Sequence, residues 1–90
     1  MAVERIAGAG NVLVPAYLAL LSLGYEVRME RDRDGRETWS ASGHELHLSA
    51  SDPLELLGLH CLRTERGADW KAGEVEIRDF LDRFGYEAPA

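Results

Sequence analysis

The fold of this chain is decided by residues 25–50, which read YEVRMERDRDGRETWSASGHELHLSA. Three runs within this stretch alternate apolar and polar side chains, the period of a strand with one buried face; the runs cover residues 25–30, 37–42 and 45–50. Asp34-Gly35 is a strong hairpin signal between the first two runs, and Ser42-Gly43-His44 predicts a second turn. Links this short join only antiparallel neighbours, so the stretch predicts a three-stranded antiparallel meander.

The two faces of the predicted sheet differ in polarity. Alternation places the apolar side chains on one face, namely Tyr25, Val27, Met29, Trp39, Ala41, Leu46, Leu48 and Ala50. The opposite face carries mostly charged and hydroxyl side chains and is polar enough to stay in water. Helices are therefore expected to cover the apolar face only.

The first predicted helix has no polar side. Residues 6–25 contain no charged side chain, and the apolar run 12–23 within them predicts a helix that Asn11 caps and Gly24 ends. A helix that is apolar nearly all the way round must be covered on most sides, and a 90-residue chain has little to cover it with. The sequence therefore predicts a homodimer, and the expected interface residues are Val12, Leu13, Ala16, Tyr17, Leu20 and Trp70.

Two further helices are predicted after the meander. Asp52 is the expected N-cap of the first of them, which ends at Gly67. The second is expected from about Gly73 to Phe84, where apolar side chains recur at three- and four-residue spacing. Trp70 lies in the link between these two helices, where it either closes one end of the core or serves as an exposed recognition anchor.

The elements together predict a single α+β domain of two layers over residues 1–90. Their order is α-β-β-β-α-α, with both C-terminal helices on one face of the sheet, and residues 1–10 form a flexible or extended arm. A content of 46% apolar and 29% charged residues is typical of a globular chain. The tip of the first hairpin, residues 31–36, carries alternating charge and is expected to be solvated or to contact a charged partner.

The chain is acidic, with ten Lys and Arg against sixteen Asp and Glu and a net charge of −6. Nucleic-acid binding through phosphate contacts needs the opposite sign, and the acidic balance also disfavours anionic membranes. The sequence favours a small non-catalytic module that self-associates and binds or inhibits a basic protein. Its single cysteine, Cys61, excludes an internal disulfide and favours a cytoplasmic location. The twelve-residue apolar run is too short to span a membrane.

An alternative interpretation starts from two glycines near the N-terminus. The segment Gly8-Ala9-Gly10-Asn11-Val12-Leu13, followed by a helix and then by the acidic Glu30, resembles the opening βαβ unit of Rossmann dinucleotide-binding domains. The resemblance implies that Gly8 and Gly10 approach a pyrophosphate, that Glu30 binds a ribose, and that residues 2–7 pair in parallel with residues 25–30. It covers about the first third of the chain, and it departs from the family pattern where Leu13 replaces the third glycine.

No metal site and no cofactor are expected outside that alternative. The soft ligands are His44, His47, His60 and Cys61. His44 and His47 tend to opposite faces of the sheet, and the neighbours His60 and Cys61 point about 100° apart on a helix. Zinc needs three or four convergent ligands. Cys61 is instead expected to fill the core, with His60 at its boundary.

No catalytic residues are predicted either, but one enzyme alternative can be stated. The polar face of the sheet places hydroxyls beside an imidazole, in the set Ser40, Ser42, Ser49 and His47. A hydrolase-like site would require His47 to lie within hydrogen-bonding distance of one of these serines, inside a pocket. Serines that alternate on an exposed strand are otherwise ordinary sheet surface.

Overall fold

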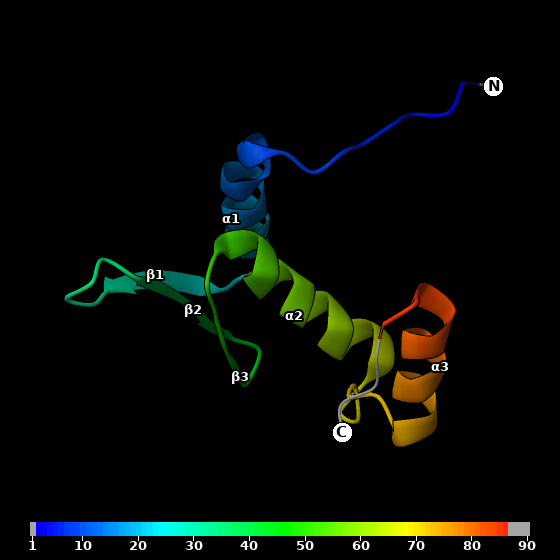
Figure 1. Ribbon diagram of the computed structural model, residues 1–90. Helices are drawn as coiled ribbons and strands as arrows, with labels where there is room; N and C mark the ends of the chain where they lie inside the picture. Colours follow the sequence, from blue (N-terminus) through cyan, green and yellow to red (C-terminus); the bar gives the residue numbers. More distant parts are fainter. Residues whose placement is uncertain (1, 87–90) are drawn as a thin grey trace.

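The computed structural model describes residues 2–86 and confirms the predicted α+β fold class (Figure 1). A helix precedes a three-stranded antiparallel meander, and two helices follow it. The elements in chain order are the 3₁₀ turn η1 (Gly10–Val12), α1 (Leu13–Ser22), β1 (Glu26–Arg31), β2 (Glu37–Gly43), β3 (Leu46–Ala50), α2 (Pro53–Arg66) and α3 (Glu74–Phe84). Residues 2–9 form no helix or strand and are exposed.

The sheet has the order β1-β2-β3, and its register brings the apolar positions together. Val27 of β1 lies opposite Ala41 of β2, which lies opposite Leu48 of β3. In the first hairpin, Asp32 Oδ1 accepts hydrogen bonds from the backbone N–H groups of Asp34 and Arg36, both at 2.9 Å. The hairpin signal in the sequence is therefore correct.

The second turn lies one residue later than the sequence suggests. Gly43 ends β2, and the turn is made by His44 and Glu45, whose φ angles of 54° and 59° are left-handed. Gly43 serves a different purpose, because a Cβ there would lie 3.2 Å from both the Gly24 carbonyl oxygen and the Tyr25 ring. The glycine is required for close packing, and two residues with side chains adopt the turn conformation that glycine and asparagine usually adopt.

The helix ends follow the predicted signals except at the first helix. Asp52 Oδ1 accepts a hydrogen bond of 2.8 Å from the Glu55 N–H, and Gly67 ends α2 with a φ of 83°. Asn11, however, does not cap α1; it lies inside η1, and Val12 occupies the N-cap position without a side-chain bond. α1 therefore begins with a 3₁₀ turn and has no polar side chain as its N-cap.

The core is small and lies between the sheet and the two helices α1 and α2, which pack against each other. Its buried members are Leu20, Tyr25, Ala41 and Leu56, with half-buried Val27, Trp39, Leu48, Ala50 and Leu57 around them. Among the described residues, Leu20 and Leu56 are the largest side chains that are wholly buried. Each therefore fixes one helix to the sheet.

The third helix lies beyond the C-terminal end of α2 (Figure 1). Of its apolar side chains only Leu81 is half-buried, whereas Ile77, Phe80 and Phe84 are exposed. The chain exposes 7,736 Å² in total, although a compact monomer of this mass exposes about 5,200 Å². Its radius of gyration is 16.2 Å, against about 12 Å for a compact chain of this length. The exposed segment 2–9 and the exposed side chains of α3 both contribute to this open shape.

No helix within residues 2–86 is long and apolar enough to cross a membrane.

Candidate functional site

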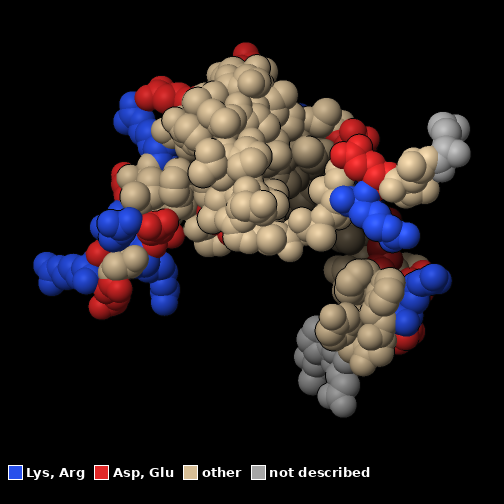
Figure 2. Space-filling model, turned by 90° about the horizontal axis from the view of Figure 1, so that it is seen from above, with Lys and Arg blue, Asp and Glu red and all other residues tan. Residues whose placement is uncertain are grey.

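The outward side of α1 is an exposed apolar ridge. Val14, Leu18 and Leu21 are 66%, 54% and 42% exposed, and their spacing of four and three residues places them on one side of the helix. Figure 2 shows the face seen from above, whose middle is formed by uncharged residues while Lys, Arg, Asp and Glu lie towards its edges. We call Val14, Leu18 and Leu21 the α1 ridge.

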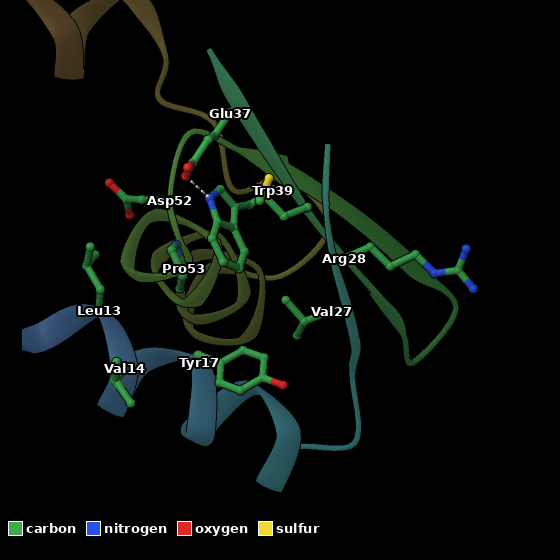
Figure 3. A pocket seen from close by; sticks show the side chains of 10 residues that line it. Leu13, Val14, Tyr17, Val27, Arg28, Glu37, Trp39, Asp52 and Pro53 are labelled. Atoms are coloured by element: carbon green, nitrogen blue, oxygen red, sulfur yellow. Dashed lines mark hydrogen bonds between the residues drawn. The ribbon is translucent and has the colours of Figure 1, made fainter. Parts of the chain in front are cut away.

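An apolar cavity of about 510 Å³ adjoins this ridge (Figure 3). It lies between α1, the strands β1 and β2 and the start of α2, and its apolar lining consists of Leu13, Val14, Tyr17, Val27, Met29, Trp39 and Pro53. Val14 belongs to both the ridge and the cavity, so the two form one continuous apolar surface. Arg28 is part of the lining, but its guanidinium group points away from the cavity.

A carboxylate at the rim of this cavity fixes the Trp39 indole. Trp39 Nε1 donates a 3.0 Å hydrogen bond to Glu37 Oε1, and the other carboxylate oxygen accepts one of 2.6 Å from Arg31. The hydrogen bonds from Arg31 and Trp39 lower the pKa of Glu37 below its ordinary value. The charged form of Glu37 is thus favoured, and it holds the indole in one orientation above the apolar lining.

The structure corrects the face of α1 that was expected to meet a partner. Ala16 and Leu20 are 3% and 0% exposed because they face the chain's own core, so no second molecule can reach them. Leu13 and Tyr17 line the cavity, and Val12 is half-buried. Nothing in the sequence marked the ridge as the outward side, since both sides of this helix are apolar.

Trp70 lies at the opposite end of the sheet from this cavity. It is half-buried and lines a second hollow of about 290 Å³ together with Leu46, Leu48, Leu59 and Arg63. Its backbone carbonyl accepts a 2.8 Å hydrogen bond from Arg66 Nε, and Lys71 Nζ lies 5.9 Å from the centre of its ring. The Arg66 bond fixes the backbone of the link, and the indole lies beside residues of β3 and α2.

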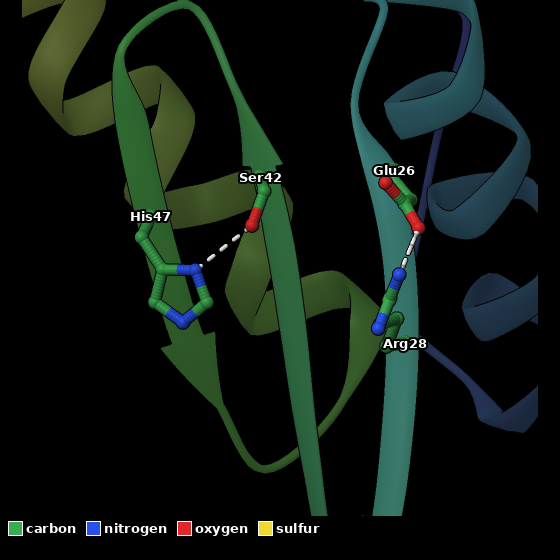
Figure 4. A network of polar contacts seen from close by, with 4 residues as sticks. All are labelled: Glu26, Arg28, Ser42 and His47. Carbon is green, nitrogen blue, oxygen red and sulfur yellow. Dashed lines mark hydrogen bonds and ion pairs between the residues drawn. The ribbon is translucent and has the colours of Figure 1, made fainter.

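The polar face of the sheet contains the contact that the enzyme alternative requires. Ser42 Oγ and His47 Nδ1 are 2.8 Å apart (Figure 4), on the wall of a hollow of about 460 Å³. Glu26 lies opposite Ser42 in the register, but Arg28 donates to its Oε1 through Nε at 2.9 Å and Nη2 at 2.6 Å. The carboxylate is therefore engaged by Arg28 and does not orient His47.

The other two histidines surround Tyr25 on the apolar side of the sheet. The Tyr25 hydroxyl lies 2.7 Å from His60 Nδ1, and His44 Nε2 donates a hydrogen bond to the Leu23 carbonyl at the end of α1. Burial raises the pKa of Tyr25. His44 and His47 thus point to opposite faces, as expected, and residues 2–86 contain no group of three side chains that could hold a metal ion.

The remaining predicted residues lie apart from these features. Cys61 is exposed on the outer side of α2, so the expectation that it fills the core is wrong. Gly8 lies in the exposed segment 2–9, which forms no strand, and the parallel pairing implied by the Rossmann resemblance is not present in the described part of the chain. Glu30 lines the hollow on the polar face of the sheet.

The α1 ridge with its cavity forms one apolar surface, and Ser42 with His47 is a polar pair within hydrogen-bonding distance. The ridge can bury branched side chains against a partner, whereas the polar pair can exchange a proton with a bound group. Comparisons with known proteins found no matching family model, curated protein or solved structure.

Proposed function

We propose that this chain is a small non-catalytic protein-interaction module that self-associates through the α1 ridge and the cavity beside it. The observation that carries the proposal is the exposure of three branched apolar side chains on one side of an uncharged helix. Burying apolar surface stabilises an association by about 25 cal/mol per Å² before ordering costs are subtracted. The ridge and cavity together supply such a surface.

A twofold axis across α1 suits the shape of this surface. Two copies of the helix that cross antiparallel near Leu18 bring Val14 of one copy close to Leu21 of the partner subunit. Because Val14 lies at the edge of the cavity, that leucine is placed to enter it. An interface of this kind is self-complementary, as closed dimers require.

The absence of charge on α1 favours a second copy as the partner, because residues 6–25 carry no charged side chain that a twofold axis would bring against its own copy. A stable interface of this kind buries about 1,200–2,000 Å² in total. The net charge of −6 favours a basic protein as any further partner, since opposite charges accelerate association.

The Leu18→Glu variant tests this proposal directly. We expect the wild-type chain to show a mass that rises with concentration in sedimentation equilibrium between about 1 and 100 μM, and the variant to remain monomeric. A carboxylate in the centre of the ridge would have to be desolvated on association. Ser49→Glu, which adds the same charge to the exposed polar face of the sheet opposite the uncharged Ser40, should associate like the wild type. If all three proteins are folded monomers across this range, self-association is refuted.

The contact between Ser42 and His47 favours a second candidate function, a small hydrolase in which His47 acts as the base for Ser42. Two features weigh against it: both side chains are exposed, and β2 is the central strand, whose backbone groups pair with strands on both sides. Neither an orienting acid for His47 nor free N–H groups that could stabilise an oxyanion are therefore placed at the serine.

Hydrolysis of p-nitrophenyl acetate separates the two candidate functions. We expect the wild type and Ser42→Ala to hydrolyse this activated ester at the same slow rate, because exposed imidazoles act on it without a serine. His47 is retained in both proteins, so the comparison isolates the hydroxyl. A rate that falls at least about tenfold in Ser42→Ala, or a burst of nitrophenol that only the wild type shows, would identify a serine nucleophile.

A further inference from the structure

The outer edge of β3 is a sheet edge without a partner strand. β3 pairs with β2 alone, because the sheet has the order β1-β2-β3. Outside the helices and strands, no backbone hydrogen bond within residues 2–86 reaches residues 46–50. Charged side chains on an edge strand oppose further pairing; β1 carries Glu26, Arg28, Glu30 and Arg31, whereas β3 carries none. The edge of β3 is therefore free to accept a further strand.

The register of the second hairpin shows which backbone groups face outward. Its turn has two residues, so Gly43 and Leu46 on either side of the turn exchange both backbone hydrogen bonds. Bonded and non-bonded pairs alternate along antiparallel strands, so Leu48 also bonds to β2. His47 and Ser49 occupy the alternate positions. Their N–H and C=O groups therefore point away from β2, along the open edge.

The hollow of about 290 Å³ beside Trp70 follows this edge. One side of it is lined by four successive residues of β3, namely Leu46, His47, Leu48 and Ser49. Side chains of successive residues point to opposite faces of a sheet, so only the edge of the strand can bring all four to one hollow. Leu59 and Arg63 of α2, together with Trp70, form the rest of the lining. An extended segment placed there would lie between the edge of β3 and α2.

Arg63 gives the lining of this hollow a positive charge. It is half-buried, and the other described residues of the lining are uncharged when histidine is neutral. Its guanidinium group makes no ion pair within residues 2–86. Arg66, in contrast, is engaged, because its Nε donates to the Trp70 carbonyl at 2.8 Å and its Nη2 lies 3.7 Å from Glu76. A carboxylate pairs strongly with a guanidinium group, so the hollow selects a segment that carries one.

We propose that β3 binds an extended segment of a partner protein, which adds a fourth strand to the sheet at this edge. The backbone of the segment bonds with the outward groups of His47 and Ser49. An apolar side chain of the segment contacts Leu48 and Trp70, and a carboxylate pairs with Arg63. Side chains two residues apart share one side of a strand, so a single residue separates the apolar side chain from the carboxylate. Strand addition at a sheet edge is a recurrent mode of peptide recognition.

This interaction does not depend on self-association, since the α1 ridge and the β3 edge belong to different elements. It also agrees with the charge of the chain. The net charge of −6 acts on the approach of a partner as a whole, whereas the hollow selects one residue of the segment that enters it. A basic protein with a single carboxylate in an extended segment meets both conditions.

Two synthetic peptides test the charge that the hollow selects. Both are about seven residues long with blocked ends, and they consist of threonine except for a central leucine and, two residues later, either glutamate or lysine. We expect the glutamate peptide to bind the wild type about tenfold more tightly than the lysine peptide, and Arg63→Glu to reverse this order. The net charge of the chain favours the lysine peptide, so it cannot produce the expected preference.

Amide chemical shifts in nuclear magnetic resonance, followed up to about 2 mM peptide, measure both affinities. Equal affinities of the two peptides for the wild type, or no binding in this range, would overturn the proposal.

Amide hydrogen exchange tests the backbone pairing at β3. In the free chain, the N–H groups of His47 and Ser49 should exchange faster than that of Leu48, which bonds to β2. Saturation with the glutamate peptide should slow exchange at His47 and Ser49 by at least about fivefold and leave Leu48 nearly unchanged. If the peptide instead perturbs only Leu13 and Tyr17, it binds in the cavity beside α1, and strand addition to β3 is refuted.

Ser49→Pro is the mutational counterpart, because it removes an outward N–H group that makes no bond to β2. It should weaken binding of the glutamate peptide at least about threefold. Ser49→Ala, which keeps the N–H group, is the matched control and should bind like the wild type. Circular dichroism shows whether Ser49→Pro is folded; if it is not, the exchange measurement on the wild type decides. Leu18→Glu should bind the peptide normally, which separates this proposal from self-association through α1.

Discussion

Leu20→Ala is expected to lower the free energy of unfolding by about 3–5 kcal/mol. Leu20 is wholly buried, and it packs with Tyr25, Ala41 and Leu56 in a core that has few other large side chains. Truncation removes its transfer free energy and leaves a cavity that so small a core cannot close. A chain of this length has about 5–10 kcal/mol of stability in total, so the variant should lose a large part of its folded population. Urea unfolding followed by circular dichroism measures the loss.

Leu18→Ala provides the matched control, because the same substitution is made two residues away on the same helix. Leu18 faces solvent, and we expect its truncation to change the free energy of unfolding by less than about 1 kcal/mol. Both proteins are to be measured at a concentration low enough to keep them monomeric, since association would add stability. Equal losses for the two variants would mean that α1 does not present Leu20 to the core.

The meander and the ends of the second helix could be predicted because their signals are local. Alternation over residues 25–50, the Asp34-Gly35 turn and the Asp52 cap each depend on a few neighbouring residues. The inward side of α1 could not be predicted in this way. Ala16 and Leu20 face the core whereas Val14 and Leu18 do not, yet all four are apolar, so periodicity does not distinguish the two sides.

The apolar stripe of α2 shows the same limit. It is too broad for one contact, because Leu56 is buried in the core while Leu62 and Cys61 are exposed on the outer side. The sequence does not show which of these apolar residues face the core, and Cys61 is therefore misassigned. The width of this apolar stripe is informative. α2 contacts its own chain along only part of the stripe, so the remaining apolar residues are open to contact with another molecule.

Gly43 shows a different limit of prediction from sequence. The glycine suggested a turn, but its role in close packing could not be predicted. A glycine between two alternating runs is typical of a turn, and the sequence alone does not show that the Tyr25 ring lies beside it. That ring is held from two sides, with the His44 and His60 rings at 5.0 Å and 5.4 Å from its centre. The space beside Gly43 is therefore closed, and His44 and Glu45 adopt the left-handed turn conformation.

Gly43→Ala is accordingly expected to lower the free energy of unfolding by about 1–3 kcal/mol. The added Cβ would lie 3.2 Å from the Gly24 carbonyl oxygen and 3.2 Å from Cδ1 of Tyr25. Neither neighbour can move easily, because one is backbone and the other is a buried ring whose hydroxyl is 2.7 Å from His60 Nδ1. Urea unfolding again provides the measurement.

Gly58→Ala gives the opposite expectation for the same chemical change. Within residues 2–86 its Cβ would meet no atom closer than 4 Å, and alanine stabilises a helix interior over glycine by about 1 kcal/mol. The free energy of unfolding of the monomer should therefore rise at Gly58 and fall at Gly43. Stabilisation at both positions would show that Tyr25 does not pack against Gly43 at the end of β2. The close packing at Gly43 would then not explain why His44 and Glu45, rather than the glycine, adopt the left-handed conformation.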